Sequence, residues 1–277
     1  MIPTYTFGEI LLHIDGVGFT PEGMDVPILR DVTTAVYNIK QEGFVRGQVV
    51  ALLGPSGVGK TTLFRIMAGL LHPTVGQVVL NGTGIPVSAG QVGVVSQDYR
   101  VLMHRTVLGN LVVAGKQAGL NDQQSLVKAK GLLEKFGLTE HSGKYPKQLS
   151  GGQRQRVAIA QQLMCSEHFL LMDEPFSGLD PLVKNRVCDL IMEVSSMNEL
   201  NTTIVVSHDI TAAAKIADTI WLMGRDRNPT TGDIVPGAYI KETFNLVDMG
   251  IAWEADIQKK PEFHQFVNDL TEKFAQL

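Results

Sequence analysis

The chain has 277 residues, of which 44% are hydrophobic and 19% charged, and it carries a formal net charge of -4 at pH 7. These fractions are typical of a folded globular protein and exclude a largely disordered or low-complexity chain. Because the charge is slightly negative, no overall basic field favours nonspecific binding to nucleic acid, and we expect no nucleic-acid partner.

The beginning of the chain and its cysteines bear on where the protein resides. The opening residues lack the basic n-region and the continuous apolar h-region of a secretory signal peptide. No run of residues approaches the length of about 20 apolar residues that crosses a bilayer. Cys165 and Cys188 lie in apolar, helical-looking stretches, so we interpret both as buried, reduced thiols. These features predict a protein that stays inside the cell, in a reducing compartment.

The first half of the chain is rich in predicted strands. Apolar and alternating patterns predict strands at residues 10–14, 28–39, 48–53, 77–81 and 92–96. From residue 107 to about residue 136 the apolar spacing becomes helical, and Gly137 is positioned to end this helical insert.

The second half of the chain alternates helix and strand. After Ser150 the pattern predicts a helix, then a strand at residues 169–172, a helix at residues 181–197 and a strand at residues 203–206. This alternation favours an α/β fold with a largely parallel, helix-covered sheet, in which catalytic loops follow the carboxyl ends of the strands. Residues 225–236 are rich in Gly, Pro, Asp and Thr and indicate a loop before a short tail.

A glycine-rich segment directly follows the strand predicted at residues 48–53. Residues 54–61 read Gly-Pro-Ser-Gly-Val-Gly-Lys-Thr, which matches the P-loop pattern, and a helical run begins immediately after them. In such a loop, backbone N–H groups surround phosphate at a helix N-terminus, Lys60 places a positive charge at the β- and γ-phosphates, and Thr61 offers a hydroxyl to Mg²⁺. The predicted nucleotide-binding residues are Gly54, Pro55, Ser56, Gly57, Val58, Gly59, Lys60, Thr61 and the supporting Thr62.

Two adjacent carboxylates end the strand predicted at residues 169–172. We expect Asp173 to hold hydrated Mg²⁺ and Glu174 to polarise the water that attacks the γ-phosphate. A strand followed by Asp-Glu is common by itself, but its position beyond a P-loop strengthens the assignment.

The segment Leu-Ser-Gly-Gly-Gln at residues 149–153 distinguishes this chain from other P-loop proteins. By local chemistry, Ser150 and Gln153 form a capping box at the start of the following helix. Together with the P-loop and the Asp-Glu pair, the segment also resembles the signature of the ATP-binding cassette family. The resemblance implies that Ser150 and Gly152 bind the γ-phosphate of a nucleotide held by the P-loop of a second copy. The implied signature residues at the nucleotide are Ser150, Gly151, Gly152 and Gln153.

Other positions match the family in the same order along the chain. Gln97 resembles the Q-loop glutamine, which the resemblance places at Mg²⁺ and in catalysis, and Asp180 in Ser-Gly-Leu-Asp resembles the D-loop aspartate. His208 follows a predicted strand and resembles the switch histidine that reaches the γ-phosphate. The implied catalytic residues are therefore Glu174, His208, Gln97 and Lys60. The remaining histidines lack metal-ligand spacing, and we interpret them as surface residues.

Phe19 is the candidate for stacking on adenine. It precedes residues 28–33, which resemble the strand that follows the adenine-stacking aromatic residue in the family. Tyr5 and Phe7 are alternatives, and an aromatic residue near a strand also commonly belongs to the core.

The resemblance extends from about residue 10 to residue 223 and implies an architecture. It implies a RecA-like P-loop NTPase core, an antiparallel β subdomain and a helical subdomain at about residues 98–162, all within an ATPase domain at residues 1–224. Residues 225–277 are expected to form a loop and a short C-terminal helical tail. The implied cofactors are ATP and Mg²⁺.

The resemblance also implies partners. Two copies pack head to tail around two nucleotides, so we expect a homodimer that ATP closes and hydrolysis opens. The sequences after Gln97 and around Glu174 look like those of import ATPases, which work with integral-membrane permease subunits and a solute-binding protein. Residues 232–234 and 261–263 look like those of nitrate, sulfonate and taurine import ATPases. The expected location is cytoplasmic, on the inner face of the cell membrane through the permease.

Other functions compete with this interpretation. The same cassette in a soluble ATPase acts on a non-membrane partner, such as an iron–sulfur assembly complex. Repair-type members interrupt the cassette with long coiled coils and translation-type members carry two cassettes, so the chain fits neither. A P-loop nucleotide kinase does not account for residues 149–153 or for His208.

Overall fold

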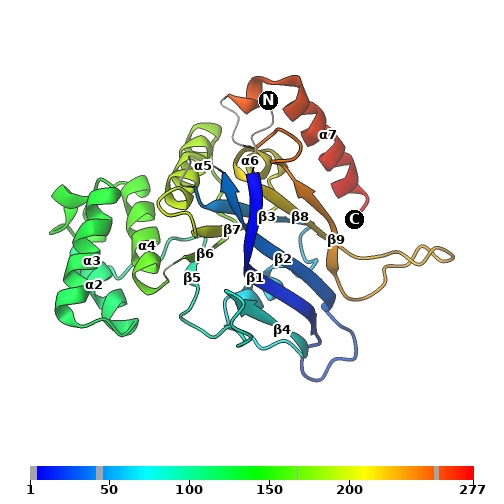
Figure 1. Ribbon diagram of the computed structural model, residues 1–277, viewed down its shortest axis with the longest axis horizontal. Helices are drawn as coiled ribbons and strands as arrows, with labels where there is room; N and C mark the ends of the chain where they lie inside the picture. The colour runs from blue at the N-terminus through cyan, green and yellow to red at the C-terminus, as the bar shows by residue number, and fades with distance from the viewer. Residues whose placement is uncertain (1–4, 42–45, 167, 253–255) are drawn as a thin grey trace.

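The larger of two sheets forms the centre of the molecule. The structure is a computed structural model that describes residues 5–41, 46–166, 168–252 and 256–277. Within these residues, a six-stranded sheet has the order β5-β6-β7-β3-β8-β9 (Figure 1). Its strands are β3 (Gln48–Leu53), β5 (Gly93–Val95), β6 (Phe169–Asp173), β7 (Thr202–Ser207), β8 (Thr219–Gly224) and β9 (Tyr239–Asn245).

The direction of these strands determines where the loops gather. The described pairings from β5 across to β8 are parallel, whereas β9 pairs with β8 antiparallel. Parallel strands place their carboxyl ends at the same edge of a sheet, so the segments after β5, β6, β7, β3 and β8 lie next to one another. The predicted α/β fold with a largely parallel sheet is confirmed.

The second sheet is antiparallel and has the order β2-β1-β4. Its strands are β1 (Tyr5–Phe19), β2 (Leu29–Gln41) and β4 (Val75–Leu80). β1 is much longer than the strand predicted at residues 10–14, because its pairing with β2 continues through several register shifts. Each shift breaks the apolar alternation, which is the feature that predicts a strand from sequence.

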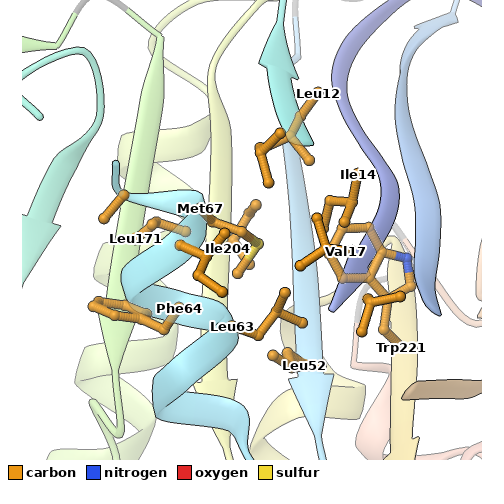
Figure 2. Close-up of a cluster of buried hydrophobic side chains, with 14 of the residues drawn as sticks. Leu12, Ile14, Val17, Leu52, Leu63, Phe64, Met67, Leu171, Ile204 and Trp221 are labelled. Atoms are coloured by element: carbon orange, nitrogen blue, oxygen red, sulfur yellow. The ribbon is translucent and has the colours of Figure 1, made fainter. Parts of the chain in front are cut away.

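Helix α1 (Lys60–Met67) is buried between the two sheets. Leu63, Phe64 and Met67 of this helix pack with Leu52 of β3 on one side (Figure 2). The same cluster contains apolar side chains of β1, so α1 is in contact with the antiparallel sheet as well. The helix that begins at the P-loop is therefore held rigidly by the main core.

A group of helices lies to one side of the parallel sheet (Figure 1). It consists of α2 (Val107–Gln117), α3 (Asp122–Lys135), α4 (Gly151–Cys165) and two 3₁₀ turns at Thr139–His141 and Pro146–Gln148. The helical region predicted at residues 107–136 is thus two helices, separated at Gly119 (φ +87) and restarted by the capping box of Asn121. Gly137 has φ +62 directly after α3, which confirms it as the helix stop.

The remaining helices cover the parallel sheet. They are α5 (Pro181–Ser195), α6 (Ile210–Ile216), a 3₁₀ turn at Ile257–Lys259 and α7 (Pro261–Ala275). Phe263, Phe266 and Leu270 of α7 are buried together with Ala51 and Leu53 of β3. No helix in the described parts of the chain is both long and apolar enough to cross a membrane.

Several sequence expectations need correction. β8 and β9 were not predicted, and β9 shows that the segment after residue 224 contains a strand of the central sheet besides a loop and a helix. β8 lacks a strong turn signal before it, since only Ala217 and Asp218 separate it from the apolar end of α6. Cys188 is buried but Cys165 is only half-buried. Among the histidines expected at the surface, His141 and His168 each have a buried Nδ1 atom.

Candidate functional site

The P-loop connects the end of β3 to the start of α1. Gly57 and Gly59 have φ angles of +75° and +123°, which favour glycine. A Cβ atom at Gly59 would lie 3.0 Å from Leu29 Cδ2 and 3.1 Å from Ile28 Cγ2, so the second sheet presses directly on the loop. No side chain forms a capping hydrogen bond at the start of α1. Its first N–H groups are therefore free to bind an anion.

Lys60 ends this loop as the first residue of α1. Only 7% of the surface of Lys60 is exposed. The Lys60 Nζ donates hydrogen bonds to Gly54 O at 2.7 Å and Pro55 O at 3.1 Å. Burial lowers the pKa of Lys60, while the nearby carboxylates of Glu174 and Asp173 act in the opposite direction. The ammonium group is thus held by weak neutral acceptors, which phosphate oxygens can replace.

The other predicted P-loop residues differ in exposure. Ser56 and Gly57 are exposed, Pro55 and Gly59 are half-buried, and Gly54 and Val58 are buried, with Val58 in the main core. Thr61 is exposed and Thr62 half-buried in the first turn of α1, as a hydroxyl offered to a ligand requires.

Asp173 is the last residue of β6 and Glu174 follows it, close to Lys60. Burial raises the pKa of Asp173, the negative charge of Glu174 raises it further, and Lys60 opposes the shift. Glu174 has φ +47, an unusual backbone conformation for this residue type, and its N–H donates to Val206 O at 2.8 Å. The backbone therefore fixes the start of the Glu174 side chain against β7.

His208 follows β7 and contacts this carboxylate. Its Nδ1 lies 2.9 Å from Glu174 Oε2, and Ser207 Oγ donates to the same oxygen at 3.4 Å. The His208 side chain is 56% exposed and that of Glu174 is 22% exposed, so the pair opens toward solvent at the sheet edge. A carboxylate held by two neighbouring groups in this way can orient and polarise a water molecule.

The predicted signature residues lie on a different surface. Ser150 Oγ accepts a hydrogen bond from Gln153 N–H at 3.3 Å, and Gln153 Oε1 accepts one from Ser150 N–H at 3.0 Å, so the predicted capping box is confirmed. Gly151 and Gly152 are exposed. Ser150, Gly151 and Gly152 line a cavity of about 1190 Å³ together with the turn after β5, and no P-loop residue lines it. Asp180 caps α5 by accepting from the N–H groups of Leu182 and Val183.

Comparison with known proteins decides the family. Residues 41–177 match the family model described as ABC transporter. Over 211 residues the chain is 36% identical to the uncharacterized ABC transporter ATP-binding protein YtlC of Bacillus subtilis (strain 168), covering 76% of this chain and 78% of that protein. The chain belongs to the ABC transporter family. It is accordingly an ATP-binding ATPase subunit of that family.

A second sequence relative and a solved structure also resemble this ABC protein. It is 39% identical over 196 residues to the sulfate/thiosulfate import ATP-binding protein CysA of Ralstonia nicotianae (strain ATCC BAA-1114 / GMI1000), covering 68% of this chain but only 52% of that protein. The chain thus spans about half the length of this relative. The solved structure of CbiO1 from Clostridium perfringens, described as part of the ABC transporter complex CbiONQ, superimposes with a TM-score of 0.71 at 21% identity, covering 95% of this chain and 100% of that chain. This match confirms the predicted fold class, and nothing among the matches favours the soluble alternative.

The residues expected to hold Mg²⁺ fit that ion in this ABC protein. No group of three or more His, Cys, Asp or Glu side chains in the described residues can hold a metal by itself. Mg²⁺ usually keeps several waters and takes one or two carboxylates in addition to substrate phosphates. Asp173 ends β6, the exposed Gln97 follows the neighbouring strand β5, and Thr61 is exposed in the first turn of α1; their oxygen atoms are the hard donors that this coordination uses.

Among the candidates for adenine stacking, Phe19 lies nearest the P-loop. It is half-buried against the main core and pairs with Leu29, which contacts the position of the Gly59 Cβ. Tyr5 pairs with Gln41 at the opposite end of β1, and its hydroxyl bonds to Asp248.

Tyr99 is a residue of the site that sequence reasoning missed. It lies in the turn after β5, two residues beyond the exposed Gln97. Its hydroxyl donates to Pro175 O at 3.2 Å and accepts from Gln155 Nε2 at 2.8 Å, and burial raises its pKa to about 12. Tyr99 therefore connects the predicted Q-loop, the segment after Glu174 and helix α4. Its only sequence signal is its proximity to Gln97.

Proposed function

We propose that this ABC protein binds MgATP at its P-loop, hydrolyses it between two copies, and so drives solute transport through a separate permease. One observation carries the proposal: Glu174 lies 2.9 Å from His208 and close enough to Lys60 to influence its pKa. Three strand ends thus supply a cation for phosphate, a carboxylate for water and a histidine that touches this carboxylate.

The chemistry follows from these side chains. Lys60 and the free N–H groups of α1 bind the β- and γ-phosphates, and Thr61 and Asp173 hold the cation. Bound Mg²⁺ neutralises the charge that develops on the phosphates. Glu174 polarises the attacking water, and Gln97 and His208 orient the water and the γ-phosphate. Because His208 touches Glu174 directly, it also holds the carboxylate in place.

The second copy completes each site. Ser150, Gly151, Gly152 and Gln153 begin a helix whose N-terminus is exposed and lies apart from the P-loop of the same chain. This position supports binding of the γ-phosphate held by a partner copy in a head-to-tail homodimer. Asp180, exposed at the start of α5, supports the same interface.

The permease is the proposed membrane partner. The cavity of about 1190 Å³ between the turn after β5 and helix α4 is large enough to receive a short helix of a permease. Its lining includes Tyr99, which connects the cavity to the segment after Glu174. A permease helix bound there would transmit a movement at the nucleotide to the membrane, and the proposed location is the cytoplasmic face of that membrane.

The direction and the solute form the finer part of the proposal. The import ATP-binding relative CysA supports import, which adds a solute-binding protein to the expected complex. The sequences at residues 232–234 and 261–263 support a small oxyanion such as nitrate, or a sulfonate such as taurine, as the solute.

We assign a separate role to each region of the chain. Residues 1–224 supply the nucleotide contacts named above, and residues 98–162 form the helical part that contacts the permease and the partner copy. Residues 225–277 add β9, the edge strand beside β8, and α7, which packs with side chains of β3.

Copurification tests the proposal. Tagged Glu174→Gln protein is expressed in its native cells, given ATP and Mg²⁺, and purified from gently solubilised membranes. We expect a multispan permease to copurify, because slow hydrolysis keeps the closed dimer on its partner. The matched control is Lys60→Ala, which should lose the ATP-dependent part of the yield. A reproducible soluble partner with no membrane protein would overturn the transport proposal.

A further inference from the structure

Arg225 is a charged residue beside the P-loop that the proposed chemistry does not use. It follows β8, which pairs in parallel with β3, so the segments after these strands are neighbours. A Cβ atom at Gly54 would lie 2.7 Å from Met223 O, which shows how closely the end of β8 approaches the start of the P-loop. The fold therefore brings Arg225 to the loop by direct strand pairing.

The guanidinium of Arg225 binds the P-loop backbone. Its Nη2 donates to Gly57 O at 3.0 Å and lies 3.4 Å from Val58 O. Its Nε is buried and has no hydrogen-bond partner in the described parts of the chain. Among the described residues, no carboxylate forms an ion pair with this guanidinium, which leaves its positive charge uncompensated beside the loop.

The adjacent carboxylate is already occupied by other groups. Asp226 pairs with Arg30 at 2.9 Å and with Lys241 at 3.4 Å, and it accepts a hydrogen bond from Tyr239 at 2.8 Å. These partners come from β2 and β9, so they anchor the chain directly after Arg225. Figure 1 shows the loop that follows extending away from the body of the molecule. Arg225 is thus at the fixed base of this loop.

We propose that Arg225 is a positioning residue that holds the P-loop in its phosphate-binding shape from the carbonyl side. In a phosphate-binding loop the N–H groups point toward the anion, so the carbonyl groups that Lys60 does not bind, among them those of Gly57 and Val58, need other donors. Arg225 supplies a donor to the peptide units of Gly57 and Val58, and its charge adds to the potential that attracts a nucleotide. This inference rests on the proposed function of the P-loop as a nucleotide site.

The test compares Arg225→Met with Arg225→Lys and with a control, Arg227→Met. Arg227 lies two residues further along the same loop and is exposed, and its guanidinium donates to Gly232 O at 3.4 Å, within the loop itself. For Arg225→Met we expect the Kd and KM for MgATP to rise about tenfold, equal to about 1.4 kcal/mol, with kcat changed by less than about twofold. Arg225→Lys should recover part of the affinity, because an ammonium can reach one carbonyl. Arg227→Met should match the unaltered protein.

A second measurement does not depend on nucleotide. Hydrogen exchange of the amides at residues 57–60, without ATP, should be faster in Arg225→Met than in Arg227→Met. Unchanged exchange together with an unchanged KM would overturn the inference. A loss of kcat and melting temperature that Arg225→Lys does not relieve would also overturn it, since that pattern indicates a general structural role. Failure of the unaltered protein to bind nucleotide would instead contradict the proposed function, and the exchange comparison would still decide the role of Arg225.

Discussion

Replacing Lys60 with methionine tests the phosphate site most simply. Methionine has a similar length but no charge and no donor. In the structure, the Lys60 ammonium makes two hydrogen bonds to backbone carbonyls, at 2.7 Å and 3.1 Å. When nucleotide binds, the ammonium exchanges these acceptors for phosphate oxygens. A hydrogen bond to a charged group contributes about 1.5–3 kcal/mol, so Lys60→Met should weaken ATP binding about 10- to 150-fold.

Stability should respond much less than affinity. Burial disfavours the Lys60 charge, as its lowered pKa shows, whereas the two carbonyl acceptors favour it. These opposing contributions leave the free energy of unfolding within about 1 kcal/mol of the original value.

Equilibrium titration with a fluorescent ATP analogue measures the affinity, and denaturant unfolding measures the stability. The control is Lys116→Met, which removes an exposed ion pair with Asp122 and should change neither quantity measurably. Equal ATP affinity in Lys60→Met and Lys116→Met would refute the assignment of Lys60 to phosphate.

Three further substitutions examine other parts of the site. Ser150→Arg should leave nucleotide affinity unchanged but prevent ATP-induced dimerisation in analytical ultracentrifugation; an unaffected dimer would exclude signature binding across the interface. Asp173→Asn should abolish the stimulation of ATP turnover by Mg²⁺ yet raise the melting temperature without nucleotide, because burial raises the pKa of Asp173 and penalises its charge. A raised pKa of a carboxyl group destabilises the folded state only at pH values where the group is ionised. The gain in melting temperature should therefore be largest at neutral pH and vanish below about pH 3.9. A gain that persists below this pH would point to another cause. Tyr99→Phe removes the hydroxyl that accepts from the Gln155 amide and should lower the free energy of unfolding by about 1–2 kcal/mol. An unchanged denaturation midpoint would contradict a stabilising role of this hydrogen bond.

Much of the fold followed from local patterns. The apolar runs that became β3, β6 and β7 were predicted within one or two residues, because each is short, buried and bounded by a polar or glycine-rich segment. β9 was missed since its side chains are half-buried or exposed and its strand character comes from pairing with β8. Pairing with a distant strand leaves no periodic signal in the sequence.

The site residues also differ in whether they can be recognised from neighbours along the chain or only from contacts made by the fold. Lys60 and Ser150 were recognisable because their roles depend on neighbours along the chain, such as glycines or a capping partner. Tyr99, Ser207 and Arg225 were not, because they contact the site through groups that the fold brings together. The expected separation of the signature from the P-loop of the same chain came from family resemblance alone.

Turnover of MgATP by purified Glu174→Gln protein tests the central claim most directly. Glutamine preserves the size of the side chain and removes the charge that polarises water. At saturating nucleotide, the account predicts that the variant binds ATP as tightly as the unaltered protein and hydrolyses it about 10²- to 10⁴-fold more slowly. Equal turnover by the two proteins, or no ATP binding by either, would contradict the account.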